Sequence, residues 1–230
     1  YGIVYSAEYF GKNFQFTLGG GANQYLGGHY GEVIWSQYAS NGNIRHRYYD
    51  NDATKNDFNI YGKLNYDLSS DLSAYVDLQQ RIVTYDFTGL DQDGSELDQT
   101  SKMSFFNPKV GLNYLLNNKT SLYAFAGVGN KEPSRDDFTE STPNSRPSHE
   151  SLIDIEIGYR YSSETVSFSA NFYNMQYNNQ LILTGELNDV GSAVRVNIPD
   201  SYRRGIELTG SFQLMDKLLG DSMQHLVKIK

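Results

Sequence analysis

The sequence has no cysteine, which excludes disulfide frameworks, thiolate metal sites and cysteine nucleophiles together. No stretch approaches the roughly 20 apolar residues that a membrane-spanning helix needs, and no basic segment followed by an apolar one opens the chain as in a signal peptide. Basic clusters are also absent: the net charge is −8 and the pI is near 4.9. Because phosphate backbones are bound by basic stripes, we exclude nucleic acid as a partner.

Tyrosine, phenylalanine and glycine are plentiful. The chain holds 19 Tyr and 12 Phe against a single Trp, together with 21 Gly. This composition favours strands and turns over helices. The length of 230 residues suits one large β domain or two small ones.

Apolar and polar residues alternate with a period of two, as in strands with one apolar face. In residues 71–86 the even positions include Leu72, Val76 and Leu78, whereas the odd positions are mostly polar. Nine such segments are predicted, at residues 2–10, 13–25, 57–68, 71–86, 104–116, 119–130, 150–162, 165–178 and 202–214. The polar face would line an aqueous lumen through Asp77, Gln79, Arg81, Asp154, Glu156, Arg203 and Glu207.

The connections distinguish a transmembrane barrel from a soluble β-sandwich. Tight turns near residues 11–13, 69–71, 117–119 and 162–164 alternate with long loops at about 26–56, 87–103, 131–149 and 179–201. Short periplasmic turns and long external loops are typical of outer-membrane barrels. The segments also run to about 9–14 residues, the length that crosses a bilayer at a barrel's tilt. Hydrocarbon offers no partner for a bare N–H or C=O, so such strands must pair on both sides.

Aromatic residues near the strand ends are candidates for the girdles at the membrane interfaces. These candidates are Tyr1, Tyr9, Phe10, Tyr66, Tyr114, Tyr159, Tyr161, Tyr177 and Tyr202.

Several short motifs follow one another in a fixed order. They are FFNPKVGL at 105–112, AFAGVGNKEPSR at 124–135, PSHESL at 147–152, EIGY at 156–159 and NIPDSYRRGIEL at 197–208. In this order the motifs resemble the carboxy-terminal half of the barrel of TonB-dependent receptors. The resemblance covers residues 102–214 and extends, more weakly, back to residue 1.

The resemblance implies an all-β fold, an antiparallel up-and-down transmembrane β-barrel of about 22 strands. Only nine or ten strands are visible, so we expect a partial barrel in residues 1–214. Residues 215–230 read as an atypical tail, either a short amphipathic helix or a truncation or appended sequence. Family members also carry a plug domain and a TonB-contacting segment, the TonB box, neither of which this chain contains.

The resemblance further implies a function. We expect a multi-pass receptor of the Gram-negative outer membrane that takes up a scarce nutrient such as an iron–siderophore, haem or cobalamin. Its partners would be outer-membrane lipid, the TonB complex acting through the plug, and a small-molecule ligand such as an iron chelate. The resemblance implies neither an enzyme nor a cofactor.

The loops and their charged residues are the candidate ligand contacts, because rigid scaffolds commonly carry recognition on loops. The first long loop mixes aromatic rings with hydrogen-bond donors: His29, Tyr30, Trp35, Tyr38, His46, Arg47, Tyr48 and Tyr49. Arg135, Asp136 and Asp137, and Arg195 with Arg203 and Arg204, are candidates to meet an anionic chelate. The alternatives are that the rings pack the loop and that the charges form a lumen network with Asp154, Glu156 and Glu207.

Other classes are weaker. A calcium site in residues 91–96 has its Gly at the wrong position for an EF-hand loop, and His29, His46 and His149 lack metal-ligand spacing. A hydrolase would pair Asp136 or Asp137 with His149, but no Gly-x-Ser-x-Gly motif occurs. A small complete barrel acting as an adhesin or pore is the remaining alternative.

Overall fold

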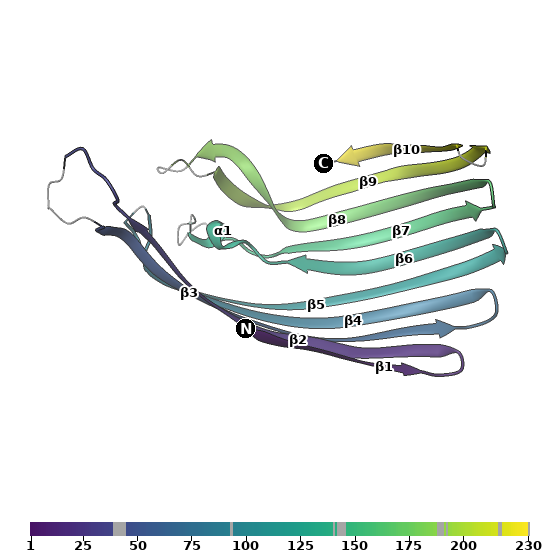
Figure 1. Cartoon of the computed structure of the whole chain (residues 1–230), viewed down its shortest axis with the longest axis horizontal. Helices are drawn as coiled ribbons and strands as arrows, with labels where there is room; N and C mark the ends of the chain where they lie inside the picture. Colours follow the sequence, from purple (N-terminus) through teal and green to yellow (C-terminus); the bar gives the residue numbers. More distant parts are fainter. Residues whose placement is uncertain are drawn as a thin grey trace.

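The computed structural model describes residues 1–38, 45–92, 94–139, 141, 146–187, 191, 193–215 and 218–229. This part of the chain forms ten antiparallel strands in a single sheet, ordered as in the sequence (Figure 1). The strands are β1 (Gly2–Phe10), β2 (Phe14–Glu32), β3 (Arg47–Asp67), β4 (Leu72–Leu90), β5 (Glu96–Asn117), β6 (Thr120–Lys131), β7 (Glu150–Ser162), β8 (Val166–Leu187), β9 (Ala193–Met215) and β10 (Leu218–Ile229), with one short helix, α1 (Arg135–Thr139), between β6 and β7.

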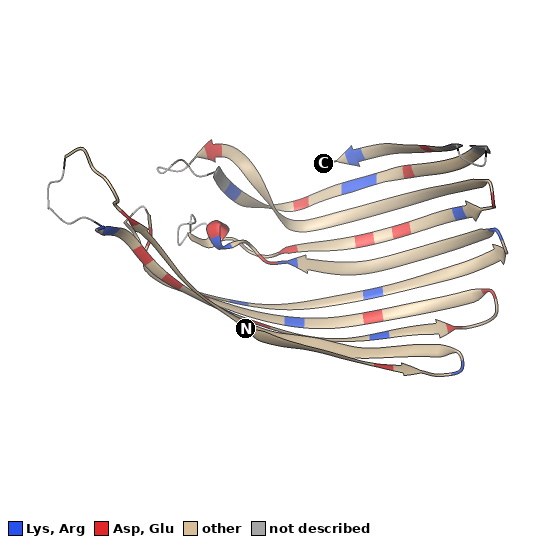
Figure 2. Ribbon diagram, in the orientation of Figure 1, with Lys and Arg blue, Asp and Glu red and all other residues tan. Residues whose placement is uncertain are grey.

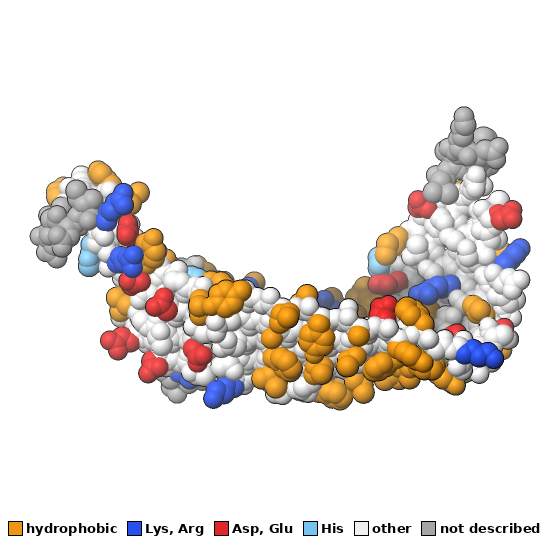
Figure 3. Space-filling view, turned by 60° about the horizontal axis from the view of Figure 1, so that its bottom comes forward, with side chains coloured by type: hydrophobic (Ala, Val, Ile, Leu, Met, Phe, Trp, Pro, Cys, Tyr) orange, Lys and Arg blue, Asp and Glu red, His pale blue; other side chains and the backbone are white. Residues whose placement is uncertain are grey.

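The sheet curves into a trough with a convex and a concave face (Figure 3). β1 and β10 form its two edges and do not pair with each other (Figure 1). Tight turns close the hairpins at one end, and the long hairpins extend from the other. This is the shape of part of a barrel wall.

The convex face is apolar. Directly paired residues point to the same side of a sheet, and pairs such as Val76 with Val110 and Phe172 with Ile206 place apolar side chains together on this face. These side chains are exposed: Ile155 keeps 43% and Phe168 40% of its surface. We call this surface the apolar belt; Figure 3 shows it in orange, and it includes Leu18, Phe58, Ile60, Val76, Leu78, Ile82, Phe106, Val110, Leu112, Ile153, Ile155, Ile157, Phe168, Phe172, Ile206 and Phe212.

The buried core is small and lies on the concave face towards the long hairpins. Ala53, Tyr85, Phe87 and Leu97 pack there against Phe138 from α1. Val83, Phe105 and Tyr173 are also buried on the concave face, and its remaining positions are mainly polar. A soluble domain hides its large apolar residues, whereas this chain exposes a continuous band of them, which indicates that lipid covers the convex face.

Three of the four predicted long loops are mainly strand. β2 and β3 extend through much of 26–56, β4 and β5 through most of 87–103, and β8 and β9 through most of 179–201. The prediction failed because beyond the belt apolar residues are no longer confined to the convex face: Ala53, Phe87 and Leu97 of these extensions are buried on the concave face. The period-two signal then disappears while the backbone ladder continues. In the remaining predicted loop, the described residues 132–134, 141 and 146–149 are irregular and 135–139 form α1.

The predicted helix in residues 215–230 is wrong, because residues 218–229 form β10 and pair with β9. The composition of this strand explains the error. Its convex-facing positions include Ser222, Gln224 and Lys228, so no regular apolar alternation marks it. Among the described residues, no helix has the length and apolarity to cross a bilayer.

Several predicted girdle residues lie on the convex face near the tight turns, where Tyr66, Tyr114 and Tyr159 follow the register of the belt. Tyr177 is an exception. It lies on the concave face, with the Arg203 guanidinium 5.5 Å from its ring centroid. Tyr177 was predicted as a girdle residue because it lies near a strand end. However, the even-numbered positions of β8 face the convex side, and the odd-numbered ones, including Tyr177, face the concave side.

Candidate functional site

The β6–β7 connection folds into the concave face and covers the wall there. Its helix α1 buries Phe138, whose ring centroid lies 5.6 Å from that of Phe87 and 6.4 Å from that of Tyr85. Burial of a phenylalanine side chain contributes about 1.5–3 kcal/mol. The apolar contact therefore holds α1 against β4.

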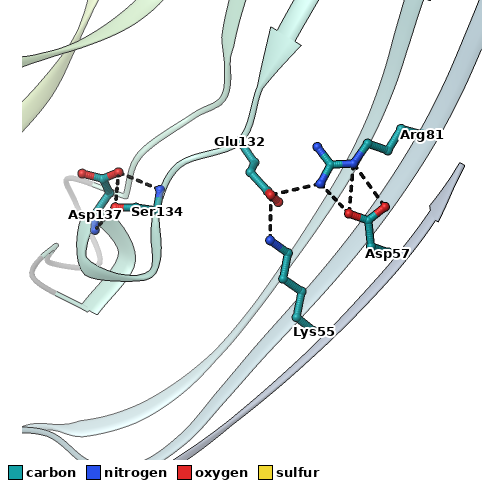
Figure 4. A network of polar contacts seen from close by, with 6 residues as sticks. All are labelled: Lys55, Asp57, Arg81, Glu132, Ser134 and Asp137. Carbon is teal, nitrogen blue, oxygen red and sulfur yellow. Dashed lines mark hydrogen bonds and ion pairs between the residues drawn. The ribbon is translucent and has the colours of Figure 1, made fainter. Parts of the chain in front are cut away.

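A charged cluster anchors the start of the same connection (Figure 4). Glu132 Oε1 accepts hydrogen bonds from Lys55 Nζ at 2.6 Å and from Arg81 at 3.1 Å. Arg81 also binds both carboxylate oxygens of Asp57, with its Nε 3.1 and 3.0 Å away. Two cations thus meet two carboxylates in a partly buried position, where charge-assisted bonds are stronger than at an exposed surface. β3 and β4 supply three of the four groups and the connection supplies the fourth.

Glu132 has unused bonding capacity. Its Oε2 is shielded from solvent and finds no hydrogen-bond partner among the described residues. A buried acceptor without a donor costs free energy.

The helix α1 is fixed by a second set of polar contacts. Asp137 accepts hydrogen bonds from the backbone N–H and the hydroxyl of Ser134, both at 2.7 Å, and pairs with Arg195 at 2.9 Å. Burial raises the pKa of Asp137, but the bonds from Ser134 and Arg195 outweigh it, so this pKa lies below its ordinary value. Asp137 is thus held ionised and links the β6–β7 connection to β9.

Arg135 and Asp136, predicted as ligand contacts, differ in their surroundings. Arg135 donates to Asn51 Oδ1 at 2.8 Å, while its Nε is buried without a described hydrogen-bond partner. Asp136 is largely exposed and lies 3.8 Å from Arg135. Arg195 pairs with Asp137, so the charge network forms with partners other than the predicted Asp154, Glu156 and Glu207.

The β2–β3 hairpin carries the predicted aromatic set. Arg47 lies 4.0 Å above the Tyr30 ring and 2.8 Å from Asp50 Oδ2. Tyr48 and Tyr49 pack edge to face with centroids 5.0 Å apart. His29 contacts Tyr25 at 3.5 Å, and His46 is exposed.

Trp35 and Tyr38, by contrast, keep 78% and 83% of their surface exposed. Part of the set therefore packs within the hairpin, as the alternative interpretation held. These two rings are available to another molecule.

The seven residues predicted to line the lumen all occupy concave-face positions in the register. Most are paired: Asp77 with Lys109 at 3.5 Å, Gln79 with Asn107 at 3.0 Å, and Glu156 with Asn171 at 3.0 Å. Glu207 lies 3.2 Å from His225, and Arg203 lies over Tyr177. Asp154 Oδ1 is buried without a described partner. The wall is thus a largely self-satisfied polar surface.

Sequence reasoning missed Lys55, Asp57, Glu132 and Asn51 as parts of the site. Residues 26–56 read as a loop, so Lys55 and Asn51 were not assigned to a face. A strand extended through that region would have placed Lys55 on the same face as Asp57. Glu132 stands within one of the ordered motifs, but its partners come from distant strands and no local pattern reveals them.

The arrangement of the described residues does not support the calcium site or the hydrolase pair considered from the sequence. Among the described residues, no group of three potential ligands is placed to hold a metal ion, and Asp93 of the 91–96 segment lies outside them. The His149 ring packs against Phe105 with centroids 5.3 Å apart. Asp137 binds Ser134 and Arg195, and no contact between Asp137 and His149 is seen among the described residues.

Comparison with known proteins agrees with this architecture. The family described as "TonB dependent receptor-like, beta-barrel" matches residues 2–224. No curated protein matches the chain. Similar solved structures include the copper transporter OprC (TM-score 0.77, 16% identity, covering 100% of this chain and 36% of that one) and the FrpB iron transporter from Neisseria meningitidis, F3-3 variant (0.68, 16%, 100% and 35%).

The ferric yersiniabactin uptake receptor FyuA from Yersinia pestis is also similar (TM-score 0.68, 13% identity, covering 98% of this chain and 34% of that one). At such identities the likeness shows the fold alone. This chain spans about a third of each of these proteins. With its family match over nearly the whole length and its exposed apolar belt, the chain belongs to the TonB-dependent receptor β-barrel family and forms part of an outer-membrane barrel.

Proposed function

We propose that the protein containing this chain takes up a scarce nutrient across the outer membrane, and that this chain supplies barrel wall and ligand-binding surface. The family supports uptake driven through TonB and a plug domain. Proteins of similar fold include copper and iron transporters and an uptake receptor for ferric yersiniabactin. A metal chelate is therefore the preferred ligand class.

The β2–β3 hairpin is the proposed capture surface. The observation that carries this proposal is the exposure of Trp35 and Tyr38 beyond the packed pair of Tyr30 and Arg47. Large rings left in water at this hairpin suit a planar, partly apolar ligand. The neighbouring Arg47 adds a cation for an anionic group on the same ligand.

The concave wall is the proposed path beneath the hairpin. Arg135 and Arg195 lie at its upper end in contact with Asn51 and Asp137. Asp136 is exposed beside them. An anionic chelate that passes the hairpin would meet these cations next, at the β6–β7 connection.

Growth rescue with the complete receptor tests the proposal. Cells that lack their other receptors are supplied with single siderophores, haem or cobalamins, in the presence and absence of TonB. We expect one ligand to rescue growth only with TonB. Replacement of Trp35 and Tyr38 by Ser should raise the ligand concentration needed for rescue at least tenfold, whereas replacement of the exposed Tyr1 by Ser should not. Rescue that is independent of TonB would reject the uptake mechanism, and an unchanged requirement in the double variant would reject the hairpin as the capture surface.

A further inference from the structure

Two cations lie side by side on the convex face where the apolar belt ends on β9 and β10. Arg204 is paired with Lys228 in the register, so both side chains leave the sheet on the same side. Both are exposed, and Figure 2 shows blue segments adjacent on β9 and at the end of β10. The next convex-facing pair is Ile206 with Leu226, both apolar and exposed.

This arrangement is unfavourable without an anion. Like charges directly opposite each other on neighbouring strands destabilise a sheet. Among the described residues, neither cation forms an ion pair with a carboxylate; Glu207 lies 3.2 Å from His225 instead, and both of these side chains face the other way. An anionic group placed between Arg204 and Lys228 would replace the repulsion with two charge-assisted contacts.

The neighbours of the two cations complete a set of donors. The Arg204 guanidinium lies 4.1 Å from the centroid of the Tyr202 ring, which keeps its side chain along the convex face. Asn174 is the partner of Arg204 on β8. Two cations, an amide and a phenol at one place match the oxygens of a phosphate group.

The height of the cations in the wall points to the source of the phosphate. On other strands the convex face turns polar at the end of the belt, as Thr84 follows Ile82 on β4 and Ser104 precedes Phe106 on β5. Arg204 follows Ile206 in the same way, on the side of the long hairpins. This is the boundary between hydrocarbon and headgroups, where Arg and Lys side chains meet lipid headgroups.

We propose that Arg204, Lys228, Tyr202 and Asn174 form a binding site for a phosphate-bearing lipid headgroup of the external leaflet. The acyl chains lie over Phe172, Ile206 and Leu226, which continue the belt directly below. The site is separate from the concave wall and does not depend on the nature of the transported ligand.

Native mass spectrometry of the complete receptor tests this site. The receptor is titrated in detergent with dioleoyl phosphatidic acid, with dioleoyl phosphatidylcholine and with inorganic phosphate. Each basic residue near a charged leaflet contributes about 1 kcal/mol. We therefore expect phosphatidic acid to bind about 30-fold more tightly than phosphatidylcholine, with no displacement by millimolar inorganic phosphate.

The matched variants are Arg204→Gln with Lys228→Gln, and Arg203→Gln as control. Arg203 adjoins Arg204 on β9 but faces the concave side over Tyr177. The double variant should lose the preference for phosphatidic acid, and Arg204→Lys should retain most of it. If Arg203→Gln lost the preference for phosphatidic acid to the same extent, the preference would depend on net charge alone, and the proposed site would be wrong. An unchanged preference in the double variant, or displacement of lipid by inorganic phosphate, would also overturn it.

Discussion

Glu132 is the residue whose replacement tests the packing of the concave face most sharply. Glu132→Gln keeps the shape of the side chain but removes the charge shared by Lys55 at 2.6 Å and Arg81 at 3.1 Å. Arg81 then keeps Asp57 as its partner, whereas Lys55 loses the carboxylate with which it pairs. Breaking a fully buried pair costs about 3–5 kcal/mol. Because these side chains are 18–25% exposed, we expect about 2 kcal/mol.

Hydrogen exchange in the complete receptor measures this loss where it arises. A cost of about 2 kcal/mol corresponds to about 30-fold faster exchange, and we expect it in residues 132–139 but not in the belt segments of β4 and β5. Glu164→Gln, in the exposed β7–β8 turn, is the matched control. Adding Lys55→Met to Glu132→Gln should restore part of the protection, because it removes the uncompensated cation. Protection of 132–139 that stays within twofold of the native value would refute the reasoning.

Further predictions concern single contacts. Phe138→Ala should cost about 3 kcal/mol of the stability that docks α1, read as faster exchange throughout that helix. A Cβ at Gly158 would lie 2.1 Å from the Tyr123 ring, so Gly158→Ala should destabilise the barrel by about 1–2 kcal/mol in urea unfolding, whereas Gly129→Ala, with open space around it, should be neutral or slightly stabilising. The pKa of Asp137 lies below its ordinary value of about 3.9, so its contribution is complete above that pH and is lost as the pH falls through the folded-state pKa. Protease protection of the β6–β7 connection should fall in the same acid range, and in Asp137→Asn it should be low at neutral pH.

The sequence predicts the wall well because the membrane imposes a period of two. Leu72, Ile155 and Phe168 alternate with polar neighbours since one face meets lipid and the other meets water. Tight turns such as that around Asn117 are also visible, because turn residues interrupt the pattern. Where the chain leaves the bilayer this constraint ends, so the extensions of β2 and β3 past the belt read as loops.

The site was only partly predictable for a related reason. The alternation within β4 is enough to place Arg81 on the polar face. Its pairing with Asp57 and Glu132 depends on the register of β3 and on the path of the β6–β7 connection. Likewise Arg195 stood out as a charge, whereas its partner Asp137 is 58 residues away. Local patterns determine the face on which a residue lies. They do not determine which distant residue meets it.

The orientation of the apolar belt is the central claim, and site-directed spin labelling of β7 tests it most directly. Residues 1–230 contain no cysteine, so in a receptor whose remaining part is also free of cysteine, single cysteines at positions 153–159 can be labelled one at a time after reconstitution in bilayers. We predict that labels at Ile153, Ile155 and Ile157 collide mainly with oxygen dissolved in lipid, and that labels at Asp154 and Glu156 do not. Uniform accessibility along the strand, or oxygen collisions greatest at Asp154 and Glu156, would contradict the assignment of this face to the membrane.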